Sequence, residues 1–159
     1  MHDRVLRLLP GALFFVAIFM VGVAGSKPPQ STFRVHVQTV EQGAPGTQIL
    51  PVSLLNPPKQ IMIRAQPELS ERDILKVESA PTESGGVALR LTLSEHGSTV
   101  LNAVTTDNQG RILVFFVNGR VVYAPVIDKI INDGIVIIPG AVAAEEVKPL
   151  EEAAKAARK

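Results

Sequence analysis

The side chains best suited to chemistry are two histidines and a serine beside one of them. Apart from His2, the histidines of the chain are His36 and His96, and there is no cysteine. No His-x-x-x-His or H-E-x-x-H pattern of a zinc site occurs. Ser94 stands two residues before His96, but no G-x-S-x-G elbow surrounds it. We expect Ser94 to cap a helix, and we predict no catalytic residue, no metal site and no enzyme activity.

Motifs for other kinds of chemistry are also missing. No G-x-G-x-x-G or P-loop string occurs, so we expect no cofactor. The adjacent carboxylates Glu145-Glu146 and Glu151-Glu152 fit the solvated face of a helix. Acidic and basic side chains balance over residues 27–159, and aromatic residues are few. A neutral domain lacks the positive surface that a phosphate backbone requires, so we expect no nucleic-acid partner.

The N-terminal segment has the composition of an export signal. Arg4 and Arg7 precede an apolar stretch whose uninterrupted part runs from Ala12 to Ala24. This part is shorter than the ~20 residues of a spanning helix and fits the ~7–15-residue apolar region of a secretory signal. We predict that residues 1–26 are a signal peptide or an uncleaved membrane anchor. The domain is then periplasmic or otherwise extracytoplasmic, with membrane contact only through residues 8–24 if the segment is uncleaved.

The first half of the remaining chain predicts short strands and loops. Residues 27–32 are polar and proline-bearing, which is typical of a linker. Residues 33–40 alternate and predict a strand, as does the short apolar run 61–63. Residues 43–58 carry four prolines and two glycines, which predicts a long loop with at most an edge strand. Ser70 is a candidate cap for one helical turn, after which the chain returns to extended structure.

Clearer patterns follow from residue 87. Residues 87–93 alternate and predict a strand with one buried face. Ser94 fits the N-cap of a helix that runs to about residue 106. Asn118-Gly119 separates two apolar runs and favours a type I′ hairpin turn. The first run, 112–117, is apolar throughout, so we expect a central strand covered on both faces. Residues 135–138 predict another short strand.

A helix is predicted to close the domain. Its apolar positions recur at alternating spacings of four and three residues, with a coiled coil as the alternative. Pro149 is expected to kink or restart this helix near Lys148. We predict an α+β fold over residues 33–152, with a charged helical tail at 153–159. The fold has a mixed β-sheet, two main helices packed on one face, and the Asn-Gly hairpin. The stripe consists of Ala143, Val147, Leu150, Ala154 and Ala157.

The order of motifs from Leu91 onward resembles a family of export proteins. L-T-L-S-E-H-G, N-Q-G, V-N-G-R-V-V-Y-A-P-V-I and G-I-V-I-I-P-G follow one another. This order is similar to the head subdomain of the first periplasmic domain of SecD and SecDF. The resemblance spans about residues 87–152 and is looser from residue 61. Its signature positions are Thr92, Gly97, Asn118, Gly119, Ala124, Pro125, Gly134, Ile138, Gly140 and Glu146.

The resemblance implies a role in protein export, because SecD and SecDF are membrane-embedded accessories of the protein translocase. We expect the chain to lack the family's transmembrane helices, and with them the proton-driven motion that those helices carry. The chain departs from the family at four positions, one of which is Pro149 in the last helix. Asn118 replaces the usual aspartate, Tyr123 a serine and Val142 an aromatic residue. We interpret the signature glycines and Pro125 as turn and packing residues.

The leading hypothesis is therefore a non-catalytic, exported envelope module that binds polypeptide. Its partner would be an unfolded or exported chain, or a protein of the export machinery. The alternative is a head-like domain recruited for ligand binding or scaffold assembly unrelated to export. No residue is assigned to polypeptide binding from the sequence. An exposed sheet edge offers a means of binding, and the proline-rich segment 43–58 makes the N-terminal part of the sheet the expected place for an open edge.

Overall fold

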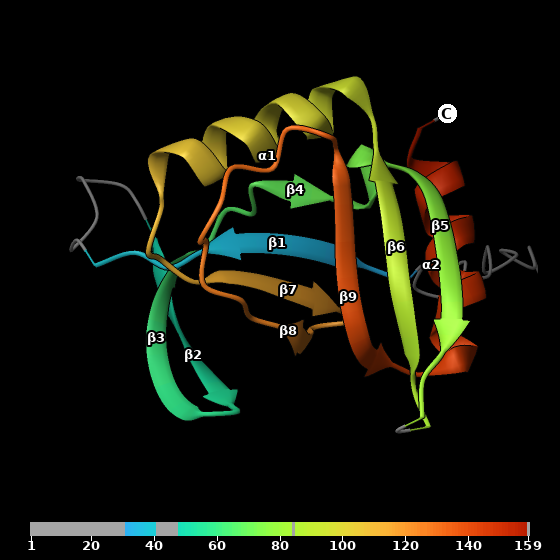
Figure 1. Cartoon of the computed structure of the whole chain (residues 1–159), viewed down its shortest axis with the longest axis horizontal. Helices are drawn as coiled ribbons and strands as arrows, with labels where there is room; N and C mark the ends of the chain where they lie inside the picture. The colour runs from blue at the N-terminus through green and yellow to red at the C-terminus, as the bar shows by residue number, and fades with distance from the viewer. Residues whose placement is uncertain (1–30, 41–47, 84, 159) are drawn as a thin grey trace, which may run out of the picture.

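We describe a computed structural model of the chain, which covers residues 31–40, 48–83 and 85–158. Two sheets lie one in front of the other with their strands crossing, a hairpin projects from one side, and two helices flank the sheets (Figure 1). The elements are β1 Phe33–Val37, β2 Ile49–Leu55, β3 Pro58–Arg64, β4 Leu69–Ser70, the 3-10 turn η1 Glu71–Asp73, β5 Ile74–Pro81, β6 Val87–Leu93, α1 Glu95–Asp107, β7 Leu113–Val117, β8 Arg120–Tyr123, β9 Ile135–Val142 and α2 Ala144–Ala157.

Each sheet is antiparallel. The first sheet has the order β4-β1-β7-β8, and the second has the order β5-β6-β9. Strands β2 and β3 pair with each other and form a separate hairpin, which we call the arm. In each of the two larger sheets, successive side chains along a strand point alternately to the core and to the opposite face.

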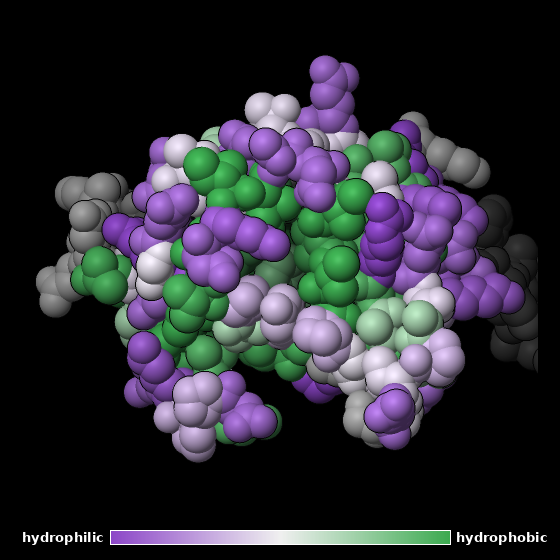
Figure 2. All heavy atoms as spheres, viewed as in Figure 1, coloured by the Kyte–Doolittle hydropathy of each residue, from purple (hydrophilic) through white to green (hydrophobic). Residues whose placement is uncertain are grey.

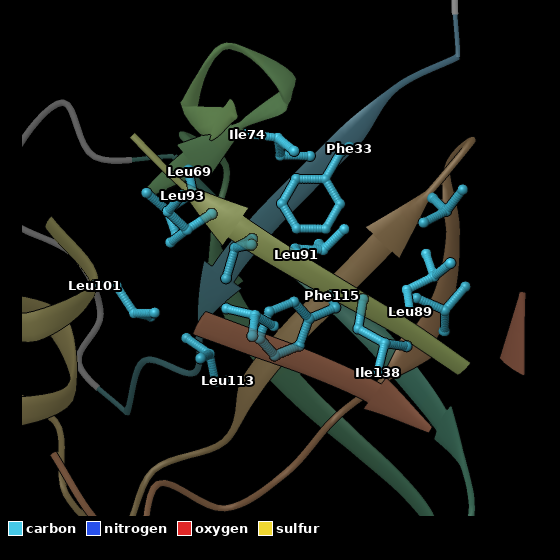
Figure 3. Close-up of a cluster of buried hydrophobic side chains, with 14 of the residues drawn as sticks. Phe33, Leu69, Ile74, Leu89, Leu91, Leu93, Leu101, Leu113, Phe115 and Ile138 are labelled. Carbon is cyan, nitrogen blue, oxygen red and sulfur yellow. The ribbon is translucent and has the colours of Figure 1, made fainter. Parts of the chain in front are cut away.

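The main core lies between the two larger sheets. Leucine side chains on the core-facing side of β6 pack toward the core-facing side chains of β1 and β7 (Figure 3). Phe33 and Phe115 are buried at its centre, with ring centroids 6.3 Å apart. The other large, fully buried side chains of this cluster are Leu69, Ile74, Leu89, Leu91, Leu101, Leu113, Ile138, Leu150 and Val35.

A second, smaller cluster lies on the opposite face of the first sheet. The arm lays Leu54, Ile61 and Ile63 against Ile112 and Val114, and all five side chains are buried. Strand β7 therefore contributes to both clusters and is central in its sheet. This arrangement confirms the prediction of a strand covered on both faces.

The local signals of the sequence are also confirmed. The Ser70 hydroxyl caps η1, and the Ser94 hydroxyl accepts a hydrogen bond from the backbone N–H of Gly97 at 3.1 Å at the start of α1. Asn118 and Gly119 have φ angles of 51° and 76°, the two positive values of a type I′ turn. Each signal depends on a few neighbouring residues, which is why the sequence alone could show it.

The α+β class is confirmed, but the arrangement of sheets and helices is corrected. The expected single mixed sheet is wrong, because every strand pair within the described residues is antiparallel and the strands form three sheets. Strands β6 and β7 flank α1 in the chain, yet they enter different sheets, so no parallel crossover forms. The helices lie along different borders of the two sheets instead of on one face: α1 lies across β4, and α2 lies beside β5 (Figure 1).

Two further expectations differ in part from the structure. The described part of residues 43–58 contains less loop than predicted: it forms the arm's turn and β2, an edge strand of the kind that the prediction allowed and that tolerates Pro51. Helix α2 continues through Pro149 without a restart near Lys148, and the carbonyl four residues before the proline is that of Glu145 in the first turn. Helix α2 runs past residue 152, as the predicted helical tail requires, and Ala153 and Ala154 are buried. Residues 1–30 lie outside the described residues, so the export segment stays a prediction.

Candidate functional site

The two histidines lie in separate places. His36 is buried beneath the arm, where its Nδ1 is 2.8 Å from the backbone carbonyl oxygen of Arg64 and its ring meets Phe116 edge-on. Burial lowers the pKa of His36 below its ordinary value, so the neutral ring that donates to the carbonyl is favoured. The alternation of residues 33–40 predicted the strand that carries His36 but not the arm that covers this side chain. His36 is a structural link between β1 and β3.

His96 lies in the first turn of α1 and pairs with Asp73. Its Nδ1 is 2.9 Å from the Asp73 carboxylate, and its side chain is largely exposed. The Ser94 hydroxyl is engaged by the backbone N–H of Gly97, so the serine acts as the predicted cap. Within the described residues, no group of three or more histidine, aspartate or glutamate side chains is placed to hold a metal ion.

Glu146 forms the centre of a polar cluster that joins the hairpin turn to α2. Its carboxylate accepts hydrogen bonds from the Asn118 amide at 3.1 Å, the Arg120 guanidinium at 2.6 Å and the backbone N–H of Ala143 at 3.0 Å. Burial raises the pKa of Glu146, but these three donors together outweigh it and hold the pKa below its ordinary value. The structure thus brings two signature residues, Asn118 and Glu146, into direct contact.

Asn118 also holds the two residues that directly precede β1. Its side-chain oxygen accepts from the Ser31 hydroxyl at 2.9 Å and from the backbone N–H of Thr32 at 3.1 Å. An aspartate, which the family resemblance leads one to expect here, could accept both bonds but could not donate to Glu146. The asparagine therefore lets a turn residue and a helix carboxylate meet without repulsion.

Two signature glycines allow close packing around the start of α1. A Cβ atom on Gly97 would lie 2.8 Å from the Cβ atom of Asp73. A Cβ atom on Gly134 would lie 2.8 Å from the Ser98 hydroxyl, and Gly134 also has a φ angle of 64°. Gly140 has a φ angle of 74° near the bulge of β9. These positions serve the packing and turns that the sequence analysis assigned to the signature glycines.

The remaining signature residues lie in different places, and one of them lines a cavity. Thr92 lies on β6 opposite Ile135, and Ile138 is buried in the main core. Ala124 packs against the second cluster beside the arm. Pro125 lines a cavity of about 360 Å³ between the chain segment 125–134 and β9. This volume is at the lower end of the ~300–1,000 Å³ range of ligand pockets.

The segment 125–134 is held firmly beside that cavity. The backbone N–H of Leu113 donates to the carbonyl of Pro125 at 2.9 Å, and the N–H of Ile127 donates to that of Arg111 at 2.8 Å. Farther along, the N–H of Ile131 donates to the buried hydroxyl of Thr105 at 3.0 Å. The cavity wall is therefore tied both to β7 and to α1. No sequence signal predicted this cavity, because its walls come from a segment without periodic hydrophobicity.

The comparisons with known proteins identify the family. A family model described as the P1 head subdomain of SecDF matches residues 47–156. The chain belongs to this family. The match begins before the 87–152 range of the sequence resemblance and includes the arm. A search of curated proteins found no match.

Two solved SecDF structures share the fold. One is described as the structure and function of a membrane component SecDF that enhances protein export, with a TM-score of 0.56 and 20% identity over 79% of this chain and 62% of that chain. The other is SecDF in a super-membrane-facing form, with a TM-score of 0.55 and 19% identity over 79% of this chain and 19% of that chain. The chain thus corresponds to part of those proteins. In the part of the chain that the structure describes, no helix is long and apolar enough to cross a membrane.

Proposed function

We propose that this chain is a non-catalytic module of the cell envelope that binds polypeptide, either an exported chain or a partner in the export machinery. The match of residues 47–156 to the SecDF head subdomain is the observation that carries this proposal. The proposal includes export through residues 1–26, so that the domain acts in the periplasm or an equivalent compartment.

The geometry is consistent with binding in place of catalysis. Two of the three side chains considered for chemistry make capping and packing contacts: Ser94 caps α1, and His36 supports the arm. Glu146 stabilises the hairpin turn and the start of α2. We propose that the signature residues maintain the fold, while binding uses backbone groups and apolar side chains.

The experiment is a titration of the full-length chain with reduced, carboxymethylated α-lactalbumin, a permanently unfolded protein. We expect saturable binding in the micromolar range or weaker, because a module that held its cargo tightly would stall it. Native α-lactalbumin is the matched control and should not bind. Absence of binding at millimolar concentration would contradict the proposal.

The alternative function is a ligand-binding or scaffold module unrelated to export, and the cavity beside β9 is the observation that favours it. A thermal-shift screen of small metabolites against the full-length chain tests this alternative. A clear stabilisation by a metabolite, together with no binding of the unfolded protein, would replace the proposed function with the alternative.

A further inference from the structure

The outer edge of β9 is not paired with another strand in the described residues. The second sheet has the order β5-β6-β9, so β9 is bonded to β6 on one side only. The cavity of about 360 Å³ lies along the other side, and β9 residues 135–137 help to line it. Figure 1 shows this border of β9 facing the segment 125–134 that leads into it.

The register shows which backbone groups point to the open side. The backbone N–H of Leu93 donates to the carbonyl of Gly134 at 2.9 Å, which makes these two residues a hydrogen-bonded pair. In an antiparallel ladder hydrogen-bonded and non-hydrogen-bonded pairs alternate. Ile137 is paired with Arg90, three positions along the ladder, and so belongs to the non-hydrogen-bonded set. Its N–H and carbonyl therefore point away from β6, toward the cavity.

Only a short part of this edge has free backbone groups, because strand pairing is blocked at both ends of it. The N–H of Ile135 is taken by the Asp133 carboxylate at 3.0 Å. Pro139 has no N–H to offer, and proline on an edge strand is a common guard against unwanted pairing. What is left open is the N–H and carbonyl of Ile137 together with the carbonyl of Ile135. This edge suits a few residues of an extended chain and not a long strand.

Apolar side chains surround the open backbone groups. Ile137 is 60% exposed, Val126 is 56% exposed and Ile130 is 46% exposed, and all three line the cavity. Hydrophobic side chains gather at the centre of this face of the molecule, and hydrophilic ones border them (Figure 2). An apolar side chain of an incoming segment would therefore find apolar contacts beside the open edge.

The charges at the cavity favour a cation over an anion. Its lining includes the carboxylates of Asp128 and Asp133 and one ammonium group, that of Lys129. The formal charge of the lining is thus negative. A segment with lysine or arginine beside its apolar residues complements this charge, while a segment with glutamate there is repelled.

We infer that the cavity beside β9 binds a short extended segment of polypeptide that adds to the β9 edge at Ile137, with an apolar side chain in the cavity and a basic residue next to it. Such strand addition takes its affinity from backbone hydrogen bonds and its selectivity from the pockets for alternate side chains. This inference rests on the proposed function and names the site through which it would act.

The test uses the full-length chain and the peptide acetyl-Lys-Val-Ile-Val-Lys-amide, measured by calorimetry or fluorescence anisotropy. A second peptide carries an N-methyl group on its central isoleucine, which removes one backbone donor and leaves the side chains unchanged. We expect the N-methyl peptide to bind at least about fivefold more weakly. A third peptide, with glutamate in place of lysine, should also bind more weakly. These comparisons leave the protein unaltered.

The protein variants locate the site. Ile137→Lys and Ile137→Pro change an exposed side chain and an outward N–H, so both should fold with an unchanged circular-dichroism spectrum. We expect each to weaken the binding of the lysine peptide and of unfolded α-lactalbumin at least about fivefold. Leu55→Lys is the matched control, because Leu55 is an 88% exposed apolar residue at the tip of the arm. It should bind both probes as the unmodified chain does.

Other outcomes of these experiments would contradict the inference, each for a different reason. If unfolded α-lactalbumin binds but the Ile137 variants bind it normally, the site is wrong and the proposed function stands. Loss of binding in Leu55→Lys would move the site to the arm. A concentration-dependent dimer that Ile137→Lys abolishes would show that a second copy occupies the edge. If the unmodified chain binds neither probe at millimolar concentration, the proposed function itself fails.

Discussion

Replacement of Gly97 by alanine tests the packing that positions α1. Gly97 is buried in the first turn of this helix, against η1. An added Cβ atom would lie 2.8 Å from the Cβ atom of Asp73, 3.1 Å from the Asp73 carbonyl oxygen and 3.3 Å from the Cβ atom of Leu93. These neighbours cannot turn away by a rotamer change, because two of them are Cβ atoms and the third belongs to the backbone. The Asp73 carboxylate is also fixed by the backbone N–H of Ser70, at 2.8 Å.

Two opposing effects set the size of the change. Alanine is favoured over glycine in a helix interior by about 1 kcal/mol, and less in a first turn. Insertion of a methyl group into a tightly packed site costs about 1–3 kcal/mol. The contact at 2.8 Å is shorter than real Cβ atoms show, so the packing cost should exceed the gain in helix propensity. We expect Gly97→Ala to lower the free energy of unfolding by about 1–2 kcal/mol.

Urea unfolding of the full-length chain measures this difference, with the slope m as the check that the compactness of both states is unchanged. Thr99→Ala is the matched control, because Thr99 is exposed in the same helix and alanine there should leave the stability equal or slightly higher. A Gly97→Ala variant as stable as the unmodified chain, or more stable, would refute the close approach of α1 to η1.

The other two predictions concern the hairpin turn and the cluster that supports it. Gly119→Val should lower the free energy of unfolding by about 1–3 kcal/mol, because Gly119 has a φ of 76° that strains a β-branched residue. Nothing lies within 4 Å of the added Cβ atom, so backbone strain alone sets this cost. An unchanged melting temperature would contradict the prediction. Glu146→Gln should cost about 1 kcal/mol at pH 7, since it weakens a charged pair with a half-exposed arginine. The folded state lowers the pKa of Glu146, so the stability that its charge contributes is present above the ordinary value of 4.5 and is lost as the pH falls through the folded pKa. The difference between Glu146→Gln and the unmodified chain should therefore shrink in acid, and an equal difference at pH 3 and pH 7 would contradict the role of the charge.

The parts of the fold that the sequence predicted are those set by neighbouring residues. Ser94 precedes an amphipathic run and caps α1, and Asn118-Gly119 separates two apolar runs and forms the hairpin turn. The alternation of residues 87–93 correctly placed one face of β6 in the core. In each case the determining interaction spans only a few positions, so no knowledge of the rest of the chain was needed.

The parts that the sequence did not predict depend on which distant surfaces meet. Hydrophobic periodicity says that a face is buried but not what buries it. The pattern therefore could not show that β6 and β7 enter different sheets, or that the arm covers the far side of β1 and buries His36. The cavity was missed for the same reason, since Pro125 on one wall and Ile137 on the other come together only in the folded chain. The sequence marked Pro125 as a signature residue, which was the one available sign of this region.

The two faces of the molecule that could pair with other chains are protected in different ways. The arm covers the far side of the first sheet with apolar side chains. The outer face of the second sheet is instead exposed and carries a charge network, in which Glu78 accepts from Lys76 at 2.7 Å and from Arg90 at 2.8 Å. Charged side chains on an exposed sheet oppose its stacking on another sheet, yet they leave the edge of β9 accessible. If the chain binds polypeptide as we propose, the charged face limits the stacking of two sheets while the edge at Ile137 pairs with the bound segment.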